Sequence, residues 1–146
     1  MLRKSSTHID DIAVGDSASC RWQIGAAQVD EFARLSQDDN PLHMDDAFAR
    51  ECGFSGRVAH GMLALSAISR LIGTELPGPG SLWMSQELHF VAPVLVGDTL
   101  EARVTVQSVS RGAAVVVLTT EALNVATQAA VLRGVAKVRL TPRISP

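Results

Sequence analysis

Apolar residues recur at helical spacing in the first half of the chain and give way to dense β-branched residues in the second half. Over residues 26–36, Val29 and Phe32 belong to a set that returns every three or four positions, which predicts an amphipathic helix. The run over residues 62–72 is apolar on nearly every face and therefore predicts a buried helix. This run is too short to cross a membrane, which takes about 20 apolar residues.

The second half of the chain predicts a β-sheet. β-Branched residues cluster around 104–106 and 115–117, and turn pairs such as Gly97-Asp98 separate the clusters. Such short connections imply antiparallel pairing of neighbouring strands. Strands are expected over residues 18–24, 82–91, 99–108, 113–123 and 129–140, with a short helix over 45–52 and a polar lead-in over 1–16 that contains a Val14-Gly15-Asp16 turn.

One apolar helix against one antiparallel sheet predicts an α+β fold. The 146 residues correspond to about one domain. The sheet is expected to wrap the helix, because an apolar helix needs cover on most of its sides. Charged residues make up 19% of the chain, below the average of roughly 25%. Part of the surface is therefore expected to be apolar, and a subunit interface is one way to bury it.

Charge and cysteine content narrow the class of protein. A formal net charge of −2 shows no basic excess, which argues against nucleic acid as a partner. Cys20 and Cys52 do not form a disulfide framework, and we expect free, partly buried thiols in a reducing compartment. Arg3 and Lys4 precede no apolar run, so the N-terminus is not a signal peptide. A soluble cytoplasmic protein is expected.

The run Asp38-Asp39-Asn40-Pro41-Leu42-His43 is the first candidate site. Asp and His are the side chains that general acid–base catalysis uses most. Because the proline moves Asn40 out of the helical region, a bend here can bring Asp38 and His43 together. The alternative is that Asp38 caps the next helix or is solvated and that His43 is an ordinary turn residue. Spacing does not choose between Asp38 and Asp39.

Gly61 precedes the apolar helix and is the second candidate. The N–H groups at a helix N-terminus are unpaired and partly positive, and a glycine lets a ligand oxygen approach the backbone, so the position suits an oxyanion hole. Gly61 would otherwise only relieve crowding at a loop–helix junction. Within the helix, Ser69 would be a buried hydroxyl, which bonds either the carbonyl one turn back or a side chain of the site.

Three segments follow one another in the order FARLSQDDNPLHMDDAFAR (32–50), GRVAHGMLALSAISRLIG (56–73) and LPGPGSLWMSQELHFVAPVLVGDTL (76–100). Together they resemble the MaoC-like hydratase family, and within it the (R)-specific enoyl-CoA hydratases. The resemblance covers about residues 10–140 and implies a hotdog fold, an antiparallel sheet wrapped around a long central helix, for the single domain 1–146. It also implies a homodimer whose sheets join edge to edge.

The resemblance also implies roles for single residues. Asp38 and His43 match the catalytic pair, and Gly61 matches the glycine whose N–H polarises the thioester carbonyl. Ser69 matches a serine that supports the site, and Asn40 matches the asparagine that shapes the loop. The implied reaction is reversible hydration of trans-2-enoyl-CoA to (R)-3-hydroxyacyl-CoA, with an acyl-CoA thioester as substrate and with no metal or other cofactor.

Two other functions remain open from the sequence. A thioesterase on the same fold would direct water at the thioester carbonyl instead of C3. A non-catalytic subunit would bind an acyl thioester without turnover. The acyl chain length, the choice between CoA and a carrier protein, and the assignment of acid and base within the pair are also left open.

Overall fold

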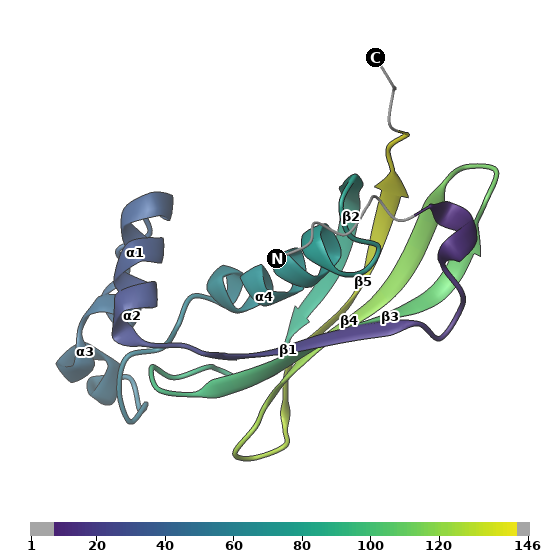
Figure 1. The fold of residues 1–146 in the computed structure, drawn as a ribbon. Coiled ribbons are helices and arrows are strands. Elements are labelled where there is room, and N and C mark those ends of the chain that lie inside the picture. Colours follow the sequence, from purple (N-terminus) through teal and green to yellow (C-terminus); the bar gives the residue numbers. More distant parts are fainter. Residues whose placement is uncertain (1–7, 143–146) are drawn as a thin grey trace.

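One long helix lies along one face of a five-stranded antiparallel sheet (Figure 1). The structure, a computed structural model, describes residues 8–142. The strands lie in the spatial order β1-β3-β4-β5-β2. The elements along the chain are the 3-10 turn η1 (Ile9–Asp11), β1 (Ser17–Gln23), α1 (Ala26–Ser36), α2 (Pro41–Met44), α3 (Asp46–Glu51), α4 (Gly61–Thr74), β2 (Ser81–Phe90), β3 (Thr99–Ser110), β4 (Val115–Asn124) and β5 (Ala130–Leu140).

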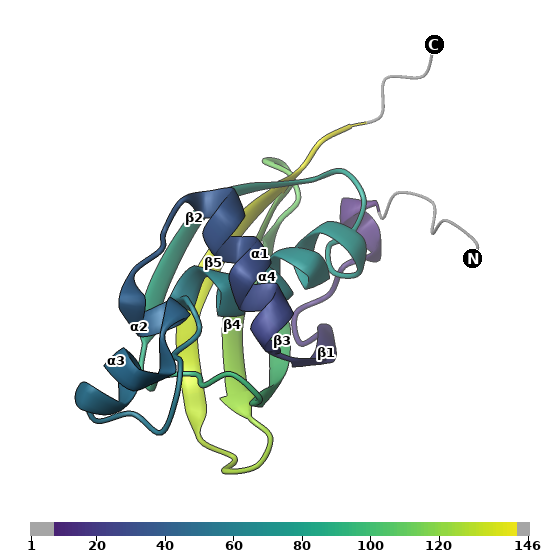
Figure 2. The ribbon, with the colours of Figure 1, turned by 90° about the vertical axis from the view of Figure 1, so that its left-hand side faces the viewer.

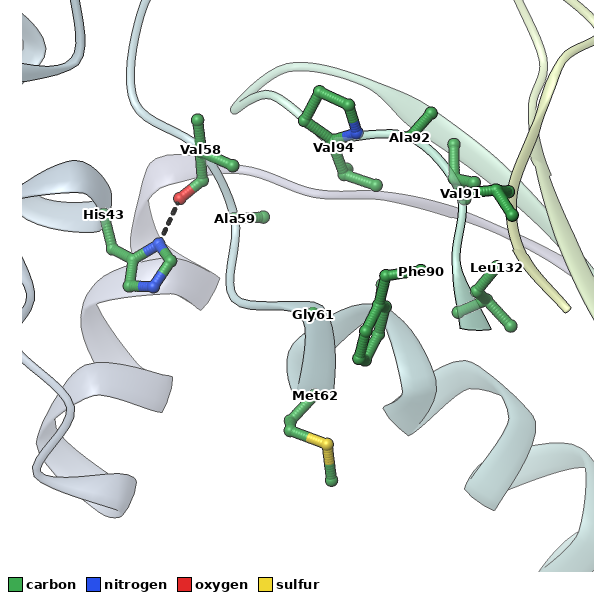
Figure 3. A pocket seen from close by; sticks show the side chains of 13 residues that line it. His43, Val58, Ala59, Gly61, Met62, Phe90, Val91, Ala92, Val94 and Leu132 are labelled. Carbon is green, nitrogen blue, oxygen red and sulfur yellow. Dashed lines mark hydrogen bonds between the residues drawn. The ribbon is translucent and has the colours of Figure 1, made fainter. Parts of the chain in front are cut away.

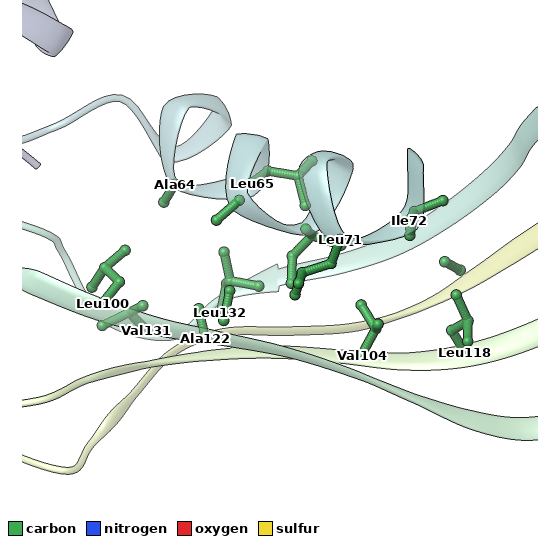
Figure 4. Packing of buried hydrophobic residues seen from close by; sticks show 14 of the residues in the cluster. Ala64, Leu65, Leu71, Ile72, Leu100, Val104, Leu118, Ala122, Val131 and Leu132 are labelled. Carbon is green, nitrogen blue, oxygen red and sulfur yellow. The ribbon is translucent and has the colours of Figure 1, made fainter. Parts of the chain in front are cut away.

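The core lies between α4 and the sheet. Leu71 and other side chains on one side of α4 pack against inward-facing strand residues such as Val104 and Leu118 (Figure 4). Buried and less buried residues alternate along β3 and β4, because only one face of the sheet is covered within the chain. Full burial of each Leu or Ile contributes roughly 1.5–3 kcal/mol, so this layer holds α4 on the sheet.

The helices α1, α2 and α3 gather at the end of the molecule where α4 begins (Figures 1 and 2). The segment before α4 is held there by the loop that joins β2 to β3. Val58 forms an isolated bridge with Leu95, and the N–H of Ala59 donates to the carbonyl of Val94 at 2.7 Å. The chain between α3 and α4 therefore has a fixed position beside the first turn of α4.

The expected α+β class and the hotdog arrangement are confirmed. The helix over 26–36 has the expected bounds, and the five strands begin and end within two residues of the expected positions. Gly53 ends the short helix with a φ of +93°, a conformation that glycine adopts without strain. Within residues 8–142, no helix is long and apolar enough to span a bilayer.

Several expectations were wrong in detail. The lead-in is not purely polar, since Ile12 is 1% exposed and belongs to the core; residues 1–7 lie outside the described part. Most of the central helix α4 is buried, as expected, but Met62 and Ser69 are exposed. Cys20 is partly buried as expected, but Cys52 is exposed.

Candidate active site

The one-turn helix α2 replaces the simple bend that the sequence suggested. Asn40 is extended, with φ −47° and ψ 127°, and its Oδ1 accepts a hydrogen bond from the Leu42 N–H at 3.0 Å. Pro41 occupies the first helical position, where its missing N–H costs nothing. An Asn cap followed by proline is a helix-start pattern that could have predicted α2. The cap and the proline fix the backbone that carries His43.

The ring of His43 is oriented by the segment before α4. Its Nδ1 lies 2.7 Å from the carbonyl oxygen of Val58 (Figure 3). Because a carbonyl only accepts hydrogen bonds, Nδ1 carries the hydrogen, and the Nε2 of the neutral ring has a free lone pair. This Nε2 lies 3.9 Å from Oδ2 of Asp38. The gap is too long for a direct hydrogen bond, and a water molecule can bridge it.

The carboxylate of Asp38 is brought to His43 by the end of α1. Gln37 adopts a left-handed conformation with φ 61°, which turns the chain away from the helix. Asp38 Oδ1 then accepts from the Asn40 N–H at 3.3 Å, and the Asp38 N–H donates to Ser36 Oγ at 3.2 Å. The Asp38 side chain is 53% exposed, whereas that of His43 is 13% exposed. The pair therefore joins a half-solvated carboxylate to a mostly buried imidazole.

Arg57 ties the helices of the site together. Its Nε donates to the carbonyl of His43, and its guanidinium pairs with Asp30 on α1, both at 2.5 Å. Its own N–H donates to Asp46 Oδ1 at the start of α3. An arginine fork suits such simultaneous contacts better than a lysine ammonium. Arg57 therefore links α2 to α1 and to the start of α3.

A cavity of about 460 Å³ opens beside this pair. His43, Gly61, Met62 and Phe90 line it, together with apolar residues from β5 and from the segment after β2 (Figure 3). Asp38 does not line it directly. The size is within the usual range for small-molecule sites, and the lining is mostly apolar.

Gly61 is the point where α4 meets the cavity. The N-cap residue His60 makes no side-chain hydrogen bond to the helix, so the first N–H groups are left for water or a ligand. The ring of Phe90 packs close to Gly61: a Cβ added there would lie 2.7 Å from Phe90 Cε1. A side chain at this position would therefore require the exposed Phe90 ring to move.

Polar atoms of Asp38, His43 and His60 lie within 4.8 Å of one another, the kind of cluster that can bind a cation. The two imidazole rings are stacked, with centroids 3.8 Å apart and planes tilted by 32°. Lone pairs lie in the ring planes, so stacked rings direct them side by side rather than toward one point. The arrangement favours proton chemistry over metal binding.

Two side chains away from the cavity have shifted pKa values. Burial raises the pKa of the Cys20 thiol above its usual 9.0, with nearby Arg70 opposing the shift and Glu75 adding to it. Hydrogen bonding from Arg21 lowers the pKa of Glu101 on β3 below its usual 4.5, with further lowering from the charges of Arg21 and Arg103.

The matches to known proteins identify the family. A model of the MaoC-like domain matches residues 10–128. The chain belongs to the MaoC-like domain family. The (R)-specific enoyl-CoA hydratase of Rhodospirillum rubrum is 46% identical over 99 residues, which cover 68% of this chain and 69% of the relative. The enzyme of the same name from Aeromonas caviae is 44% identical over 109 residues, covering 75% and 81% of the two chains.

The fold of a solved MaoC-like relative agrees with this assignment. The (R)-hydratase from A. caviae involved in PHA biosynthesis matches with a TM-score of 0.85 at 41% identity. The match covers 89% of this chain and 98% of that one.

Some site residues of this MaoC-like domain lie where the sequence placed them and others do not. Asp38, Asn40, His43 and Gly61 gather at the start of α4, as expected. Ser69 is exposed about two turns along α4 and is outside the cavity lining, so the expected buried hydroxyl is wrong, and its supporting role stays a prediction.

Sequence reasoning missed three contacts of the MaoC-like site. The side chain of Arg57 is 14% exposed and paired with Asp30, although no motif in the sequence assigns it to the site. His60 and Phe90 received no role in the site. The close packing of Phe90 on Gly61 joins residues far apart in the chain and has no local pattern.

Proposed function

We propose that this MaoC-like protein reversibly hydrates trans-2-enoyl-CoA to (R)-3-hydroxyacyl-CoA. The observation that carries the proposal is the 3.9 Å separation between His43 Nε2 and Asp38 Oδ2, which lets one water bond to both atoms, beside a cavity that begins at the Gly61 end of α4. The names of the relatives from R. rubrum and A. caviae support the same reaction. The reaction makes the protein a carbon–oxygen lyase.

In the proposed mechanism, Asp38 and His43 hold one water between them. The water oxygen attacks C3 of the enoyl thioester while one member of the pair removes its proton. The proton taken from the water passes to C2 on the same face, so that the H and OH of one water add across the C2–C3 double bond. The free Nε2 lone pair of His43 suits acceptance of a proton, but the two groups act as a unit, and the assignment of base and acid stays open. Such help contributes roughly 10²–10⁴-fold to rate.

Negative charge that develops on the thioester oxygen requires a donor. In the proposal, the N–H of Gly61 supplies it, since this amide stands at an uncapped helix start that lines the cavity. A donor of this kind is worth roughly 2.7–4 kcal/mol in the transition state. The apolar lining receives the first carbons of the acyl chain and excludes competing water.

The test replaces Asp38→Asn and His43→Gln separately. Each variant should hydrate crotonyl-CoA at least about 10²-fold more slowly, because each removes one half of the proton-transfer pair. Asp39→Asn is the matched control, since it changes the adjacent exposed carboxylate outside the cluster and should leave the rate near wild type. Near-normal hydration by either site variant would overturn the assignment.

The same assay separates the other candidate functions. Loss of enoyl absorbance without release of free thiol indicates hydration, whereas free thiol from an acyl-CoA indicates a thioesterase. Binding of crotonyl-CoA with no turnover indicates a non-catalytic subunit. Both of these results would contradict the proposal.

We also propose that the protein is a homodimer joined through β2. This strand is an edge of the sheet and exposes Leu82 and Met84, each 55% exposed. An unpaired edge with apolar side chains invites another strand. Light scattering should give twice the monomer mass, and Met84→Lys should lower it; a monomeric wild type would refute the dimer. The cytoplasmic location stays a prediction.

A further inference from the structure

His60 is a buried histidine that the proposed chemistry does not use. It is 2% exposed and is the N-cap residue of α4, immediately before Gly61. It does not line the cavity, so it has no surface to offer a substrate. A buried polar side chain usually has hydrogen-bond partners, and the contacts of His60 Nε2 and of its ring indicate what this imidazole does.

The first contact fixes Asp38. Nε2 of His60 lies 2.9 Å from the backbone carbonyl oxygen of Asp38. Because this oxygen can only accept, the hydrogen of the ring is on Nε2. The other nitrogen, Nδ1, is buried and has no hydrogen-bond partner within residues 8–142, which agrees with a bare lone pair there, since an orphan N–H would be the rarer case.

The second contact fixes the ring of His43. The His60 ring contacts Phe32, with centroids 4.8 Å apart and planes tilted by 56°, and His43, with centroids 3.8 Å apart. Phe32 belongs to α1 and His43 to α2, so the His60 ring joins both helices to the start of α4. One side of the His43 ring therefore rests on His60, while its Nδ1 is held by Val58.

We propose that His60 is a positioning residue that holds the water-binding pair in register with the Gly61 amide. Its ring orients His43, its Nε2–H holds the backbone of Asp38, and its own backbone leads directly into Gly61. The inference rests on the proposed hydration, and it adds a residue that acts through the pair without touching substrate. A misplacement of about 1 Å at such a pair costs roughly 10²-fold in rate.

Two substitutions separate the hydrogen bond from the stacking. His60→Phe keeps an aromatic ring that can contact Phe32 and His43 and removes the donor to Asp38. His60→Gln removes the ring but keeps an amide N–H that reaches the place of Nε2. We expect His60→Phe to lower kcat for crotonyl-CoA about 10²-fold and to leave KM within about threefold, because the substrate makes no contact with His60. His60→Gln should retain at least about tenfold more activity than His60→Phe.

The control is His8→Gln, which changes an exposed histidine outside the site and should keep wild-type constants. A His60→Phe variant with normal kcat would overturn the proposal, as would a loss that falls on KM. Equal loss in both variants, accompanied by an equal fall in melting temperature, would also overturn it, since that pattern is the one a purely structural histidine gives.

A measurement without substrate distinguishes failure of this inference from failure of the proposed function. Long-range ¹H–¹⁵N spectra of the imidazoles should show the Nε2–H form for His60 and the Nδ1–H form for His43. An Nδ1–H form at His60 would refute the positioning contact whatever reaction the protein catalyses. If the spectra agree and no enoyl thioester is hydrated, the proposed function fails while the contact stands.

Discussion

Replacing Gly61 by alanine puts the oxyanion proposal to its most direct test. The new Cβ would lie 2.7, 2.8 and 3.1 Å from three carbons of the Phe90 ring. Ordinary contact between carbons begins near 3.4 Å, so the ring has to move by about 0.7 Å. Phe90 is 53% exposed and can turn outward. Glycine is the poorer helix former by about 1 kcal/mol, which offsets part of the lost packing.

Stability and activity should therefore respond differently to Gly61→Ala. We expect the free energy of unfolding to change by no more than about 1 kcal/mol, because the gain in helix propensity opposes the displacement of Phe90. The rate of crotonyl-CoA hydration should fall about 10²–10³-fold, because the methyl group stands where the thioester oxygen approaches the N–H. Chemical denaturation and the loss of enoyl absorbance measure the two quantities.

The double variant Gly61→Ala with Phe90→Ala decides what the methyl group blocks. Removing the Phe90 ring relieves the clash but leaves a methyl group on the residue whose N–H is proposed to meet the thioester oxygen. We expect the double variant to be slower than Phe90→Ala alone by the same factor by which Gly61→Ala is slower than wild type. Recovery of the rate in the double variant would refute the reasoning, because displacement of Phe90 would then explain the whole loss.

Two further expectations concern pKa shifts outside the cavity. Because burial raises the pKa of the Cys20 thiol, its reactive thiolate forms only in more alkaline solution. A disulfide reagent should therefore modify exposed Cys52 first and Cys20 only as the pH rises toward about 9 and above. Mass spectrometry of the labelled chain measures the order, and modification of Cys20 first would contradict the reasoning. The lowered pKa of Glu101 means that folding favours its charged form: this stabilisation is present above its usual pKa of 4.5 and is lost as the pH falls through the lower folded value. Glu101→Gln should therefore lose less stability than wild type between about pH 5 and pH 3, and equal losses in urea titrations would contradict the role of Arg21.

Hydrophobic periodicity was sufficient to predict most elements but not which sides of them are covered. The 62–72 run identified α4, yet a run that is apolar nearly all round does not say that Met62 and Ser69 stay exposed in the chain. Ile12 lies in a short segment with Ile9, Ala13 and Val14, whose apolar residues follow no helix or strand period long enough to signal a core position. Both errors arise because burial depends on the tertiary neighbours rather than on the local pattern.

The sequence predicted the part of the candidate site whose residues are close together in the chain, and it missed the contacts between residues that are far apart. The residue types in the 38–43 run indicated proton chemistry, and the choice of Asp38 over Asp39 came from the family resemblance. In the structure, Asp38 is the carboxylate that lies 3.9 Å from His43. The contacts of His60 reach 22 residues back to Asp38 and 17 back to His43. No spacing rule relates residues in a loop to partners that far away.

The four-residue segment Val58 to Gly61, called the site segment below, carries three of the contacts that build the site. It contains the acceptor for His43, the imidazole that touches Asp38 and the amide proposed to meet the thioester. A deletion of one residue within it would misalign all three at once. The cavity wall from Phe90 and Leu132 is contributed by other elements. Libraries of variants that change this wall and keep the site segment unchanged should therefore alter the preference for acyl chains without altering the proton-transfer geometry.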